Sequence, residues 1–448
     1  MSVTERRNKA ASSGASGLLD YDSGRAGDVA GRTGHGAGHL ARAAAVAVSD
    51  TTGPARTAHM LLRLLRAAQP ISRVELARRL DVNRSTVTEL VKPLIAAGVV
   101  REETLAQPSG TSRASGRPPV GLAFNSDNDL FIGVNLGVRR SQVGLTTLGG
   151  EILAEEDFDT PAEQGEALAL IRASLERLCA QEASGRKLKI IGVSVPGPTD
   201  AGRARLLYAP RLGWSDVAVA DALRLSSPGG TSVPVVVEND ATAAAIYEAR
   251  LRLRDMTVGL VDDFILVRSG TGIGVGVVLG GEVYRGTGQG RGVAGEFGHM
   301  TIVAGGKQCV CGNRGCWERY ASASAASSLY MGDRIQLGGM QAPRYIEIVE
   351  RAEAGELRAQ KTLERIGEYL GIGIGNVIAG LGVPHVIVSG RIVYGWKFLS
   401  EPLRAAISQS MAGKVAGWSV EPGEPTGAGL GGALEVAVDG FLTSGLSV

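Results

Sequence analysis

Cysteine and aromatic residues are scarce in this chain of 448 residues, and long apolar runs are absent. Three of its only four cysteines fall within one short stretch, which argues against a secreted disulfide scaffold and for a reducing compartment. No apolar run approaches the roughly 20 residues that span a bilayer, and the N-terminus lacks a basic-then-apolar export signal. We therefore expect a cytoplasmic protein without a membrane partner.

Charge is unevenly distributed, although the net charge is only +2. Residues 55–121 contain 11 Lys and Arg against 5 Asp and Glu, a balance of +6, so the remainder of the chain carries −4. A compact basic segment on an acidic body is typical of a nucleic-acid reader joined to a second domain. Residues 1–54 are mostly Gly, Ala, Ser and Arg, and we expect them to form a disordered tail.

Periodic leucines predict a three-helix segment within residues 55–125. The stretch "TAHMLLRLLRAA" repeats Leu at helical spacing. Ser72, with Glu75 three residues later, predicts the start of the second helix, and the third helix contains "NRSTVTELVK" and ends at Gly98. Two short β-type runs then flank a Ser/Gly/Pro-rich tip, as in a hairpin wing. These features predict a winged helix-turn-helix that binds double-stranded DNA, and a helical bundle with a charged surface is the alternative.

The beginning of the third helix and the wing carry the side chains that we expect to contact DNA. Short polar and cationic groups on the helix suit base edges and phosphates: Arg84, Ser85, Thr86, Thr88 and Lys92. In the wing sequence "SGRPP", Arg117 can enter a narrow A·T-rich minor groove. A Pro-rich linker between domains explains the wing sequence equally well.

Residues 126–448 follow an alternating α/β pattern with an internal echo. The stretches "LFIGVNLGVRRSQVGLTTLGGEIL" and "DFILVRSGTGIGVGVVLGGEVY" share Phe-Ile near the start and Leu-Gly-Gly-Glu near the end. The echo predicts two related lobes with a cleft between them.

Two polar residues are expected at the edge of this cleft. In "VVVENDATAAAIYEA", Asn239 and Asp240 follow a strand and precede a helix, which is where open α/β sheets bind ligands. An amide that donates and accepts, beside a carboxylate that accepts, suits a polyol, and Asp240 could act as a general base toward a sugar hydroxyl. The alternative is that both residues only cap the helix. The turn "GTGIGVG" at 270–276 could cradle a phosphate, or simply permit a positive φ.

The cysteine-rich stretch "HMTIVAGGKQCVCGNRGCWE", residues 299–318, has the composition of a metal site. Thiolates and imidazole hold Zn²⁺ tetrahedrally, and the predicted ligands are His299, Cys309, Cys311 and Cys316. Four protein ligands leave no position for a water nucleophile, so this zinc would be structural and would fix the loop that carries Glu296 and Glu318. A disulfide between Cys309 and Cys311 is the redox alternative, but a one-residue spacer makes it strained.

These stretches together resemble the ROK family of repressors, open reading frames and sugar kinases over about residues 55–448. The matching motifs are C-x-C-G-x-x-G-C-x-E at 309–318, E-N-D-A at 238–241, E-x-G-H at 296–299 and "VPGP" at 195–198. The resemblance implies an α/β fold in which the winged helix-turn-helix precedes a two-lobed, actin-like, sugar-kinase-like domain, usually as a homodimer or tetramer. It also implies contacts to sugar hydroxyls from Asn239, Asp240, Glu296, His299 and Glu318, with His299 binding zinc through its other ring nitrogen.

Departures from the family pattern fall where kinases hold ATP. ROK kinases carry D-x-G-G-T-K on the first strand of the domain, whereas this chain reads "VNLGVRR". Asn135 is a poor Mg²⁺ ligand beside a carboxylate, and Val138 adds bulk where phosphate would approach. We therefore expect sugar recognition without catalysis, with Asp240 a vestigial base. Arg211 stands where the family often has Asn, which would alter ligand choice or admit an acidic or phosphorylated sugar.

The combined features predict a sugar-responsive transcriptional regulator, a repressor of carbohydrate-metabolism genes that is not an enzyme. Sugar binding would move the lobes and change the separation of two DNA-binding heads in a dimer. The alternative is a bifunctional ATP-dependent sugar kinase with a DNA-binding module, which would need Asn135 to be tolerated. A third hypothesis makes the cleft a docking surface for a phosphotransfer protein.

Overall fold

The computed structural model describes residues 53–443 with several internal gaps. The gaps are 106–119, 126–128, 183–184, 227–229, 256–262, 288–291, 333–341 and 416. The predicted tail up to residue 52 and the wing tip with Arg117 therefore lie outside the described residues. Among the helices that are described, none is both long enough and apolar enough to cross a membrane.

The N-terminal segment is a winged helix-turn-helix, as predicted. Its three helices are α2 (Gly53–Ala68), α3 (Arg73–Arg79) and α4 (Arg84–Ala96). A small antiparallel sheet has the order β1-β3-β2, in which β1 (Ile71–Ser72) lies between α2 and α3, and β2 (Val100–Thr104) and β3 (Val120–Phe124) follow α4. The expected cap of α3 is confirmed, because Ser72 Oγ accepts a hydrogen bond from Glu75 N at 3.1 Å.

Apolar side chains at helical spacing join the helices of this segment. Leu76 of α3 is buried against Val87 and Val91 of α4. Helix α4 ends where Gly98 adopts a φ of +70°, which glycine tolerates without steric cost. The buried face of α4 leaves its other face open to solvent.

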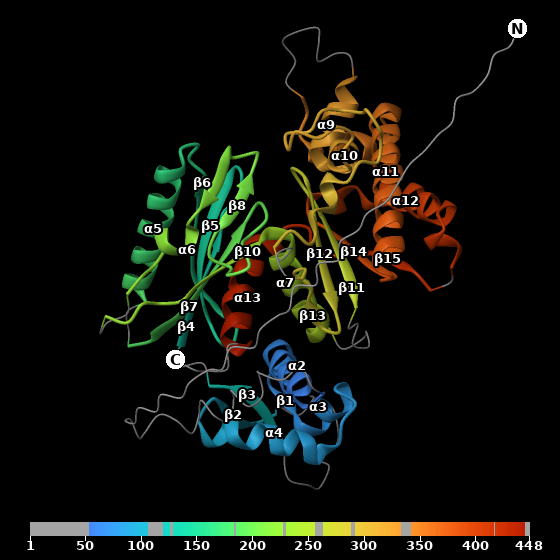
Figure 1. Ribbon diagram of the computed structural model, residues 1–448. Coiled ribbons are helices and arrows are strands. Elements are labelled where there is room, and N and C mark those ends of the chain that lie inside the picture. The colour runs from blue at the N-terminus through green and yellow to red at the C-terminus, as the bar shows by residue number, and fades with distance from the viewer. Residues whose placement is uncertain are drawn as a thin grey trace, which may run out of the picture. The chain divides into compact units, whose positions relative to one another are not determined.

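The first lobe is built on a five-stranded sheet of order β10-β7-β4-β5-β6 (Figure 1). Its strands are β4 (Asp129–Asn135), β5 (Arg140–Thr147), β6 (Ile152–Asp159), β7 (Lys187–Val195) and β10 (Val235–Asn239). Strands β4, β5 and β6 are antiparallel, whereas β7 and β10 run parallel to β4. The hairpin of β8 (Leu206–Ala209) and β9 (Trp214–Val217) is separate from this sheet.

The second lobe repeats this topology in a sheet of order β13-β12-β11-β14-β15. Its strands are β11 (Phe264–Ser269), β12 (Ile273–Leu279), β13 (Glu282–Val283), β14 (His385–Ser389) and β15 (Ser419–Pro422). Again three strands are antiparallel and two are parallel. The matching orders confirm the two related lobes that the sequence echo predicted.

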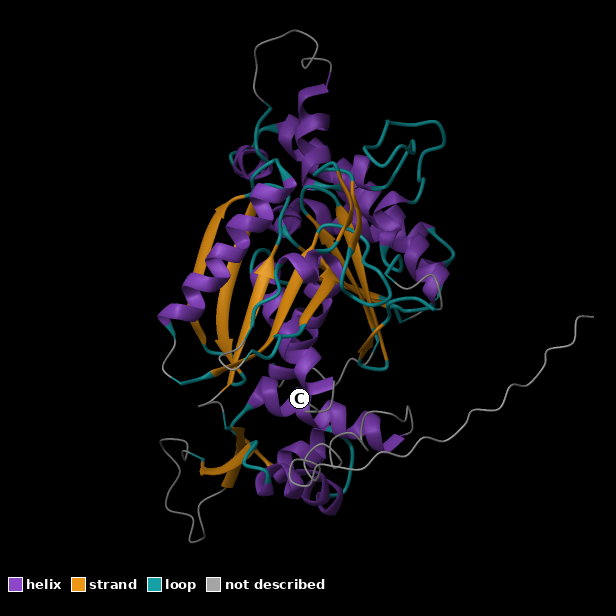
Figure 2. Cartoon of the chain, turned by 60° about the vertical axis from the view of Figure 1, so that its left-hand side comes forward, coloured by secondary structure: helices purple, strands orange, loops and turns teal. Residues whose placement is uncertain are grey.

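Helices cover both faces of each sheet (Figures 1 and 2). Helices α7 (Asp240–Arg254) and α13 (Ala428–Thr443) pack on each other between the two sheets, and α5 (Gln164–Gln181) covers the outer face of the first. The outer face of the second sheet packs on a helical cluster. That cluster contains α8 (Glu318–Ala321), α9 (Ala323–Met331), α10 (Tyr345–Glu353), α11 (Leu357–Leu381) and α12 (Trp396–Gln409).

The remaining described elements are short helical turns. These are α6 (Val219–Ala222) and the 3-10 helices η2 (Glu296–His299), η4 (Arg391–Gly395) and η5 (Ala412–Lys414).

Burial on both faces explains why the strands read as continuous apolar runs. In β11, Ile265 and Val267 face the outer helical cluster, while Phe264 and Leu266 face α7. In the first sheet, Gly133 faces α13. A Cβ atom at this position would lie only 2.6 Å from Leu434 N, so no larger residue fits there. Glycine at this position lets the α13 backbone lie directly on the sheet, which brings α13 and α7 to the strand ends that form the pocket.

Candidate functional site

A cavity of about 940 Å³ lies at the carboxyl ends of strands from both lobes. It is lined by the last residues of β4 and β10 in the first lobe and of β11 in the second, together with the residue after β14. This is the strand end at which open α/β sheets bind ligands, and the volume suits a small molecule. The cleft between related lobes that the sequence predicted is therefore present.

Asn239 lines the pocket and also caps helix α7. Its Oδ1 accepts hydrogen bonds from Ala241 N at 2.9 Å and Thr242 N at 3.2 Å, while its Nδ2 donates to Gly197 O at 3.2 Å. The capping alternative thus holds for Asn239, without removing it from the pocket wall. One amide hydrogen remains for a ligand.

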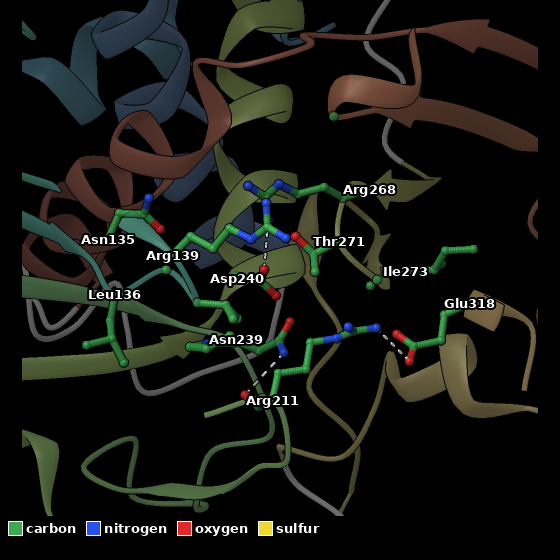
Figure 3. Close-up of a pocket in the computed structure, with 18 of the residues that line it drawn as sticks. Asn135, Leu136, Arg139, Arg211, Asn239, Asp240, Arg268, Thr271, Ile273 and Glu318 are labelled. Carbon is green, nitrogen blue, oxygen red and sulfur yellow. Dashed lines mark hydrogen bonds and ion pairs between the residues drawn. The ribbon is translucent and has the colours of Figure 1, made fainter. Parts of the chain in front are cut away.

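Asp240 is paired with an arginine that the sequence reasoning missed. Arg268 Nη1 lies 2.7 Å from Asp240 Oδ2, and the two side chains point toward each other in the pocket (Figure 3). Arg268 follows four apolar residues in strand β11, two residues before the glycine-rich turn. A charged residue next to a run of apolar strand residues is the sequence feature that could have pointed to Arg268.

Glu318 is held by a second arginine. Arg211 Nη2 donates to Glu318 Oε1 at 3.0 Å, across the pocket as Figure 3 shows. The buried Glu318 carboxylate also accepts from Cys309 Sγ at 3.2 Å. It therefore connects the pocket with the cysteine cluster.

Glu296, a third acidic group, is poised between charge states. Burial, together with the nearby negative charges of Asp240 and Glu318, raises its pKa to about 7. At neutral pH the carboxyl is close to half protonated, so it is able to donate or accept a hydrogen bond. His299, at the other end of η2, places Nε2 3.9 Å from Glu296 Oε2. Both side chains are half-buried and line the pocket.

An amide, Asn135, ends strand β4 at the position where the family resemblance implies the acidic metal anchor of kinases. Asn135 Nδ2 donates to Gln142 Oε1 at 3.1 Å, and both residues line the pocket beside Val138 and Arg139. Two neutral amide groups are much weaker ligands for a magnesium ion than a carboxylate is.

The glycine-rich turn between β11 and β12 has a packing role of its own. Gly270 N donates to Gly272 O at 3.0 Å, and a Cβ atom at Gly272 would collide with the Glu318 carboxylate. The glycines thus admit Glu318 to the pocket wall, whether or not the turn also binds phosphate.

The four predicted metal ligands come together. One ligand atom from each of His299, Cys309, Cys311 and Cys316 lies within 4.8 Å of all the others. Zinc–sulfur bonds of about 2.3 Å place two tetrahedral sulfur ligands about 3.8 Å apart, and Cys311 Sγ lies 3.7 Å from Cys316 Sγ. His299 Nδ1 lies 3.6 Å from Cys309 Sγ. This donor set fits a structural zinc ion.

In the absence of a metal, the buried thiols of the cluster are held in their protonated form. Burial raises the pKa of the Cys309 and Cys316 thiols, and the Glu318 carboxylate raises that of Cys309 further. A bound metal would supply the positive charge that holds these thiols as thiolates. All four cysteines of the chain are free of disulfides.

The predicted DNA-contacting residues of α4 share one exposed side of the helix. Those exposed residues are Arg84, Ser85, Thr86, Thr88 and Lys92. Thr88 Oγ1 donates back to Arg84 O at 2.9 Å, so its hydroxyl hydrogen is already used within the helix. Helix α4 therefore presents a short polar and cationic surface to solvent.

Comparison with known proteins decides the family. Residues 131–439 match the sequence profile of the ROK family. The chain belongs to the ROK family. Residues 55–101 of this ROK protein match a winged helix-turn-helix DNA-binding profile.

Regulators and kinases both occur among the relatives of this ROK protein. The xylose repressor of Bacillus subtilis is 30% identical over 351 residues, covering 78% of this chain and 85% of its own. The DNA-binding transcriptional dual regulator NagC of Escherichia coli is 26% identical and covers 77% and 83%.

Solved structures similar to this chain include both a ROK regulator and a ROK kinase. A ROK family transcriptional regulator, described as a homologue of the Escherichia coli MLC protein, superposes with a TM-score of 0.65 at 26% identity. It covers 87% of this chain and 98% of its own. A ROK glucokinase from Streptomyces griseus, in complex with glucose and AMPPNP, gives 0.57 at 28% identity and covers 69% and 99%. The fold class inferred from the motifs is confirmed.

Proposed function

We propose that this ROK protein is a transcriptional repressor whose affinity for DNA is set by a sugar bound between the lobes. The observation that carries the proposal is the extent of similarity. The match to the xylose repressor extends beyond residues 131–439, and the solved ROK regulator covers 87% of this chain, whereas the glucokinase covers 69%. The similarity to regulators includes the DNA-binding segment, and the similarity to the kinase does not account for it.

The proposal assigns each function to a part of the chain. Residues 55–125 would read DNA through the exposed side of α4, with Arg117 in the wing. Residues 126–448 would bind the sugar, and the cysteine cluster would hold a structural zinc. The sugar ligands would be Asn239, Asp240, Glu296, His299 and Glu318. Two copies in a homodimer would present two DNA-binding heads in the cytoplasm, where the chromosome lies.

We also infer that phosphoryl transfer has been lost. A kinase needs a carboxylate to organise Mg²⁺ and a base free to accept a hydroxyl proton. Asn135 offers an amide, and the Asp240 carboxylate is engaged by Arg268 at 2.7 Å. Without the metal anchor the pocket retains hydrogen-bonding groups for a sugar but lacks those for the reaction.

The arginines of the pocket bear on the chemistry of the sugar. Arg139, Arg211 and Arg268 line the same cavity as Asp240, Glu296 and Glu318. A guanidinium binds phosphate and carboxylate groups well, so acidic sugars belong among the candidates beside neutral ones.

The test is a thermal-shift screen followed by DNA binding. The panel contains xylose, glucose, N-acetylglucosamine, their phosphates and glucuronate. Any sugar that raises the melting temperature is then added to full-length protein on labelled DNA from upstream of its own gene. We expect the sugar to weaken DNA binding by roughly tenfold or more, in the range typical of allosteric coupling. A sugar that binds the protein without changing its DNA affinity would refute the proposal.

A further inference from the structure

Helix α2 and the residue that follows it contact both lobes, at the turns between strands on the side away from the pocket. Gln69, just after α2, donates from Nε2 to Gly149 O at 3.2 Å, in the turn between β5 and β6. Arg63 of α2 donates from Nη1 to Gly281 O at 2.6 Å, in the turn between β12 and β13. Strands β5 and β12 both begin at the pocket and run toward these turns. The first helix of the DNA-binding segment therefore spans the two lobes.

Arg63 ties α2 to two elements at once. Its Nε donates to Asp439 Oδ1 of α13 at 2.8 Å. Its Nη1 and Nη2 donate to the two Glu282 oxygens of β13 at 2.8 and 3.0 Å, and His59 Nδ1 lies 3.3 Å from the same carboxylate. Burial raises the pKa of Asp439, but the charge and hydrogen bond of Arg63 outweigh burial and hold it below its ordinary value. Both members of this pair are charged at neutral pH.

A second arginine of α2 is sealed in the same junction. Arg66 is 3% exposed, and its Nη2 lies 3.1 Å from Glu435 Oε1 of α13. Arg250 of α7 shares that carboxylate. Burial lowers the pKa of Arg66 to about 10, so it stays charged, and its Nε and Nη1 have no hydrogen-bond partner among the described residues. The buried Arg66 and the partly buried Arg250 share one carboxylate, an arrangement that tolerates little displacement.

The helices that meet α2 begin at the pocket. Helix α7 starts with Asp240 and ends near Leu253, whose carbonyl accepts from Arg79 Nη1 of α3 at 2.9 Å. Its 15 residues give a length of about 22 Å. Helix α13 follows directly on pocket-lining residues, and a Cβ atom at Gly429 in its first turn would lie 2.7 Å from Asn135 Nδ2. Two rigid elements thus join the pocket wall to the DNA-binding segment.

We propose that Arg63, held at once by Asp439 of α13 and Glu282 of β13, is the positioning residue that transmits movement of the lobes to the DNA-binding segment. A guanidinium group presents its donors in a fixed planar fork. When the second lobe moves relative to α13, the Arg63 guanidinium cannot remain hydrogen-bonded to both Asp439 and Glu282. Helix α2 must then move with one of these two carboxylates. The proposal rests on the proposed function in one respect, because a sugar in the pocket is what would move the lobes.

The variant Glu282→Gln tests this role in the full-length protein. It keeps the size of the side chain but removes the charge that Arg63 and His59 face, and Glu282 is half-exposed, so the fold is expected to persist. Glu176→Gln on α5, where Glu176 pairs with Arg172, is the matched control. DNA affinity is measured by fluorescence anisotropy on the upstream fragment, without and with saturating xylose, glucose or N-acetylglucosamine.

We expect Glu282→Gln to bind sugar within about twofold of wild type, while the sugar-induced change in DNA affinity falls at least fivefold, because couplings of this kind span roughly 5–150-fold. By reciprocity, DNA should then change sugar affinity less by the same factor. Arg63→Lys, which keeps the charge but loses the fork, should show the same loss. Full wild-type coupling in Glu282→Gln would overturn the proposal.

A second readout separates this proposal from the proposed function. Hydrogen exchange of the turn at residues 270–274 is followed on adding the upstream DNA fragment without any sugar. We expect DNA to change this exchange in wild type and in Glu176→Gln, but not in Glu282→Gln. A wild-type protein whose DNA affinity no sugar alters would refute the proposed function, whereas equal DNA-induced protection in wild type and Glu282→Gln would refute the role of Arg63.

Discussion

Single residues determine the charge of the pocket. Arg268 neutralises Asp240 and Arg211 neutralises Glu318, each through a charge-assisted hydrogen bond of 2.7 to 3.0 Å. Here the protein supplies the balancing charges itself, and the carboxylates remain oriented toward the space that a sugar would fill.

The variant Asp240→Asn should separate sugar binding from DNA binding. Loss of a charged acceptor costs about 2 kcal/mol per hydrogen bond, so sugar affinity should fall roughly thirtyfold while DNA affinity without sugar stays near wild type. Isothermal titration calorimetry and anisotropy measure the two quantities. Asp221→Asn on α6, an exposed carboxylate paired with Arg224, is the control. If Asp240→Asn weakened both kinds of binding, Asp240 would have a folding role instead.

The sequence predicted the acidic residues of the pocket but not the arginines that pair with them. Asn239, Asp240, Glu296 and Glu318 were named from local motifs, because each motif fixes its own strand end or loop. The partners of the acidic residues were not, because Arg268 is 28 residues from Asp240 and Arg211 is 107 residues from Glu318. Such pairs depend on how the two lobes face each other, and no local pattern encodes that.

Among the elements, the cysteine loop connects the metal cluster with the pocket. Its end is anchored by Trp317, which is fully buried and donates from Nε1 to Tyr369 O of α11 at 2.9 Å. Glu318 follows immediately and begins α8. A metal at the cluster would therefore fix both His299 and Glu318, one at each end of the loop.

Zinc removal should weaken sugar binding through this loop. We expect the purified protein to carry one zinc per chain, and Cys311→Ser to lose it, melt at a lower temperature and bind sugar at least about tenfold more weakly. Elemental analysis, thermal melting and calorimetry give the three values. Cys179→Ser, far from the cluster in α5, should retain all of them. Wild-type protein without stoichiometric metal, or sugar affinity that survives the loss of zinc, would contradict this assignment.

The elements were more predictable than their contacts. Strands β4 and β11 read as apolar runs because both faces are buried, and the echo between the lobes survived because each lobe repeats the same antiparallel triplet. Ser72 marked the start of α3 because a cap is a local interaction. The contact of Gln69 with the turn at Gly149 could not be foreseen, since it depends on how α2 meets the folded lobes.

At the scale of the whole molecule, the pocket and the DNA-binding segment attach to opposite ends of the same sheets. A sugar at the carboxyl strand ends does not reach the DNA-binding segment, where Gln69 contacts the turn at Gly149 and Arg63 of α2 contacts the turn at Gly281. Any effect of sugar on DNA must therefore pass through elements that extend between the two, and α7 and α13 are such elements. The sugar shifts DNA binding only if it prefers one arrangement of the lobes over the other.

The central claim is that the sugar controls DNA binding by occupancy alone, without phosphoryl transfer. The most direct measurement follows anisotropy of the labelled upstream DNA and ADP release in one sample, as the sugar is added first alone and then with Mg²⁺ and ATP. The account predicts release of DNA by the sugar alone and no sugar-dependent ADP. Release that requires ATP, accompanied by sugar-dependent ADP, would contradict it.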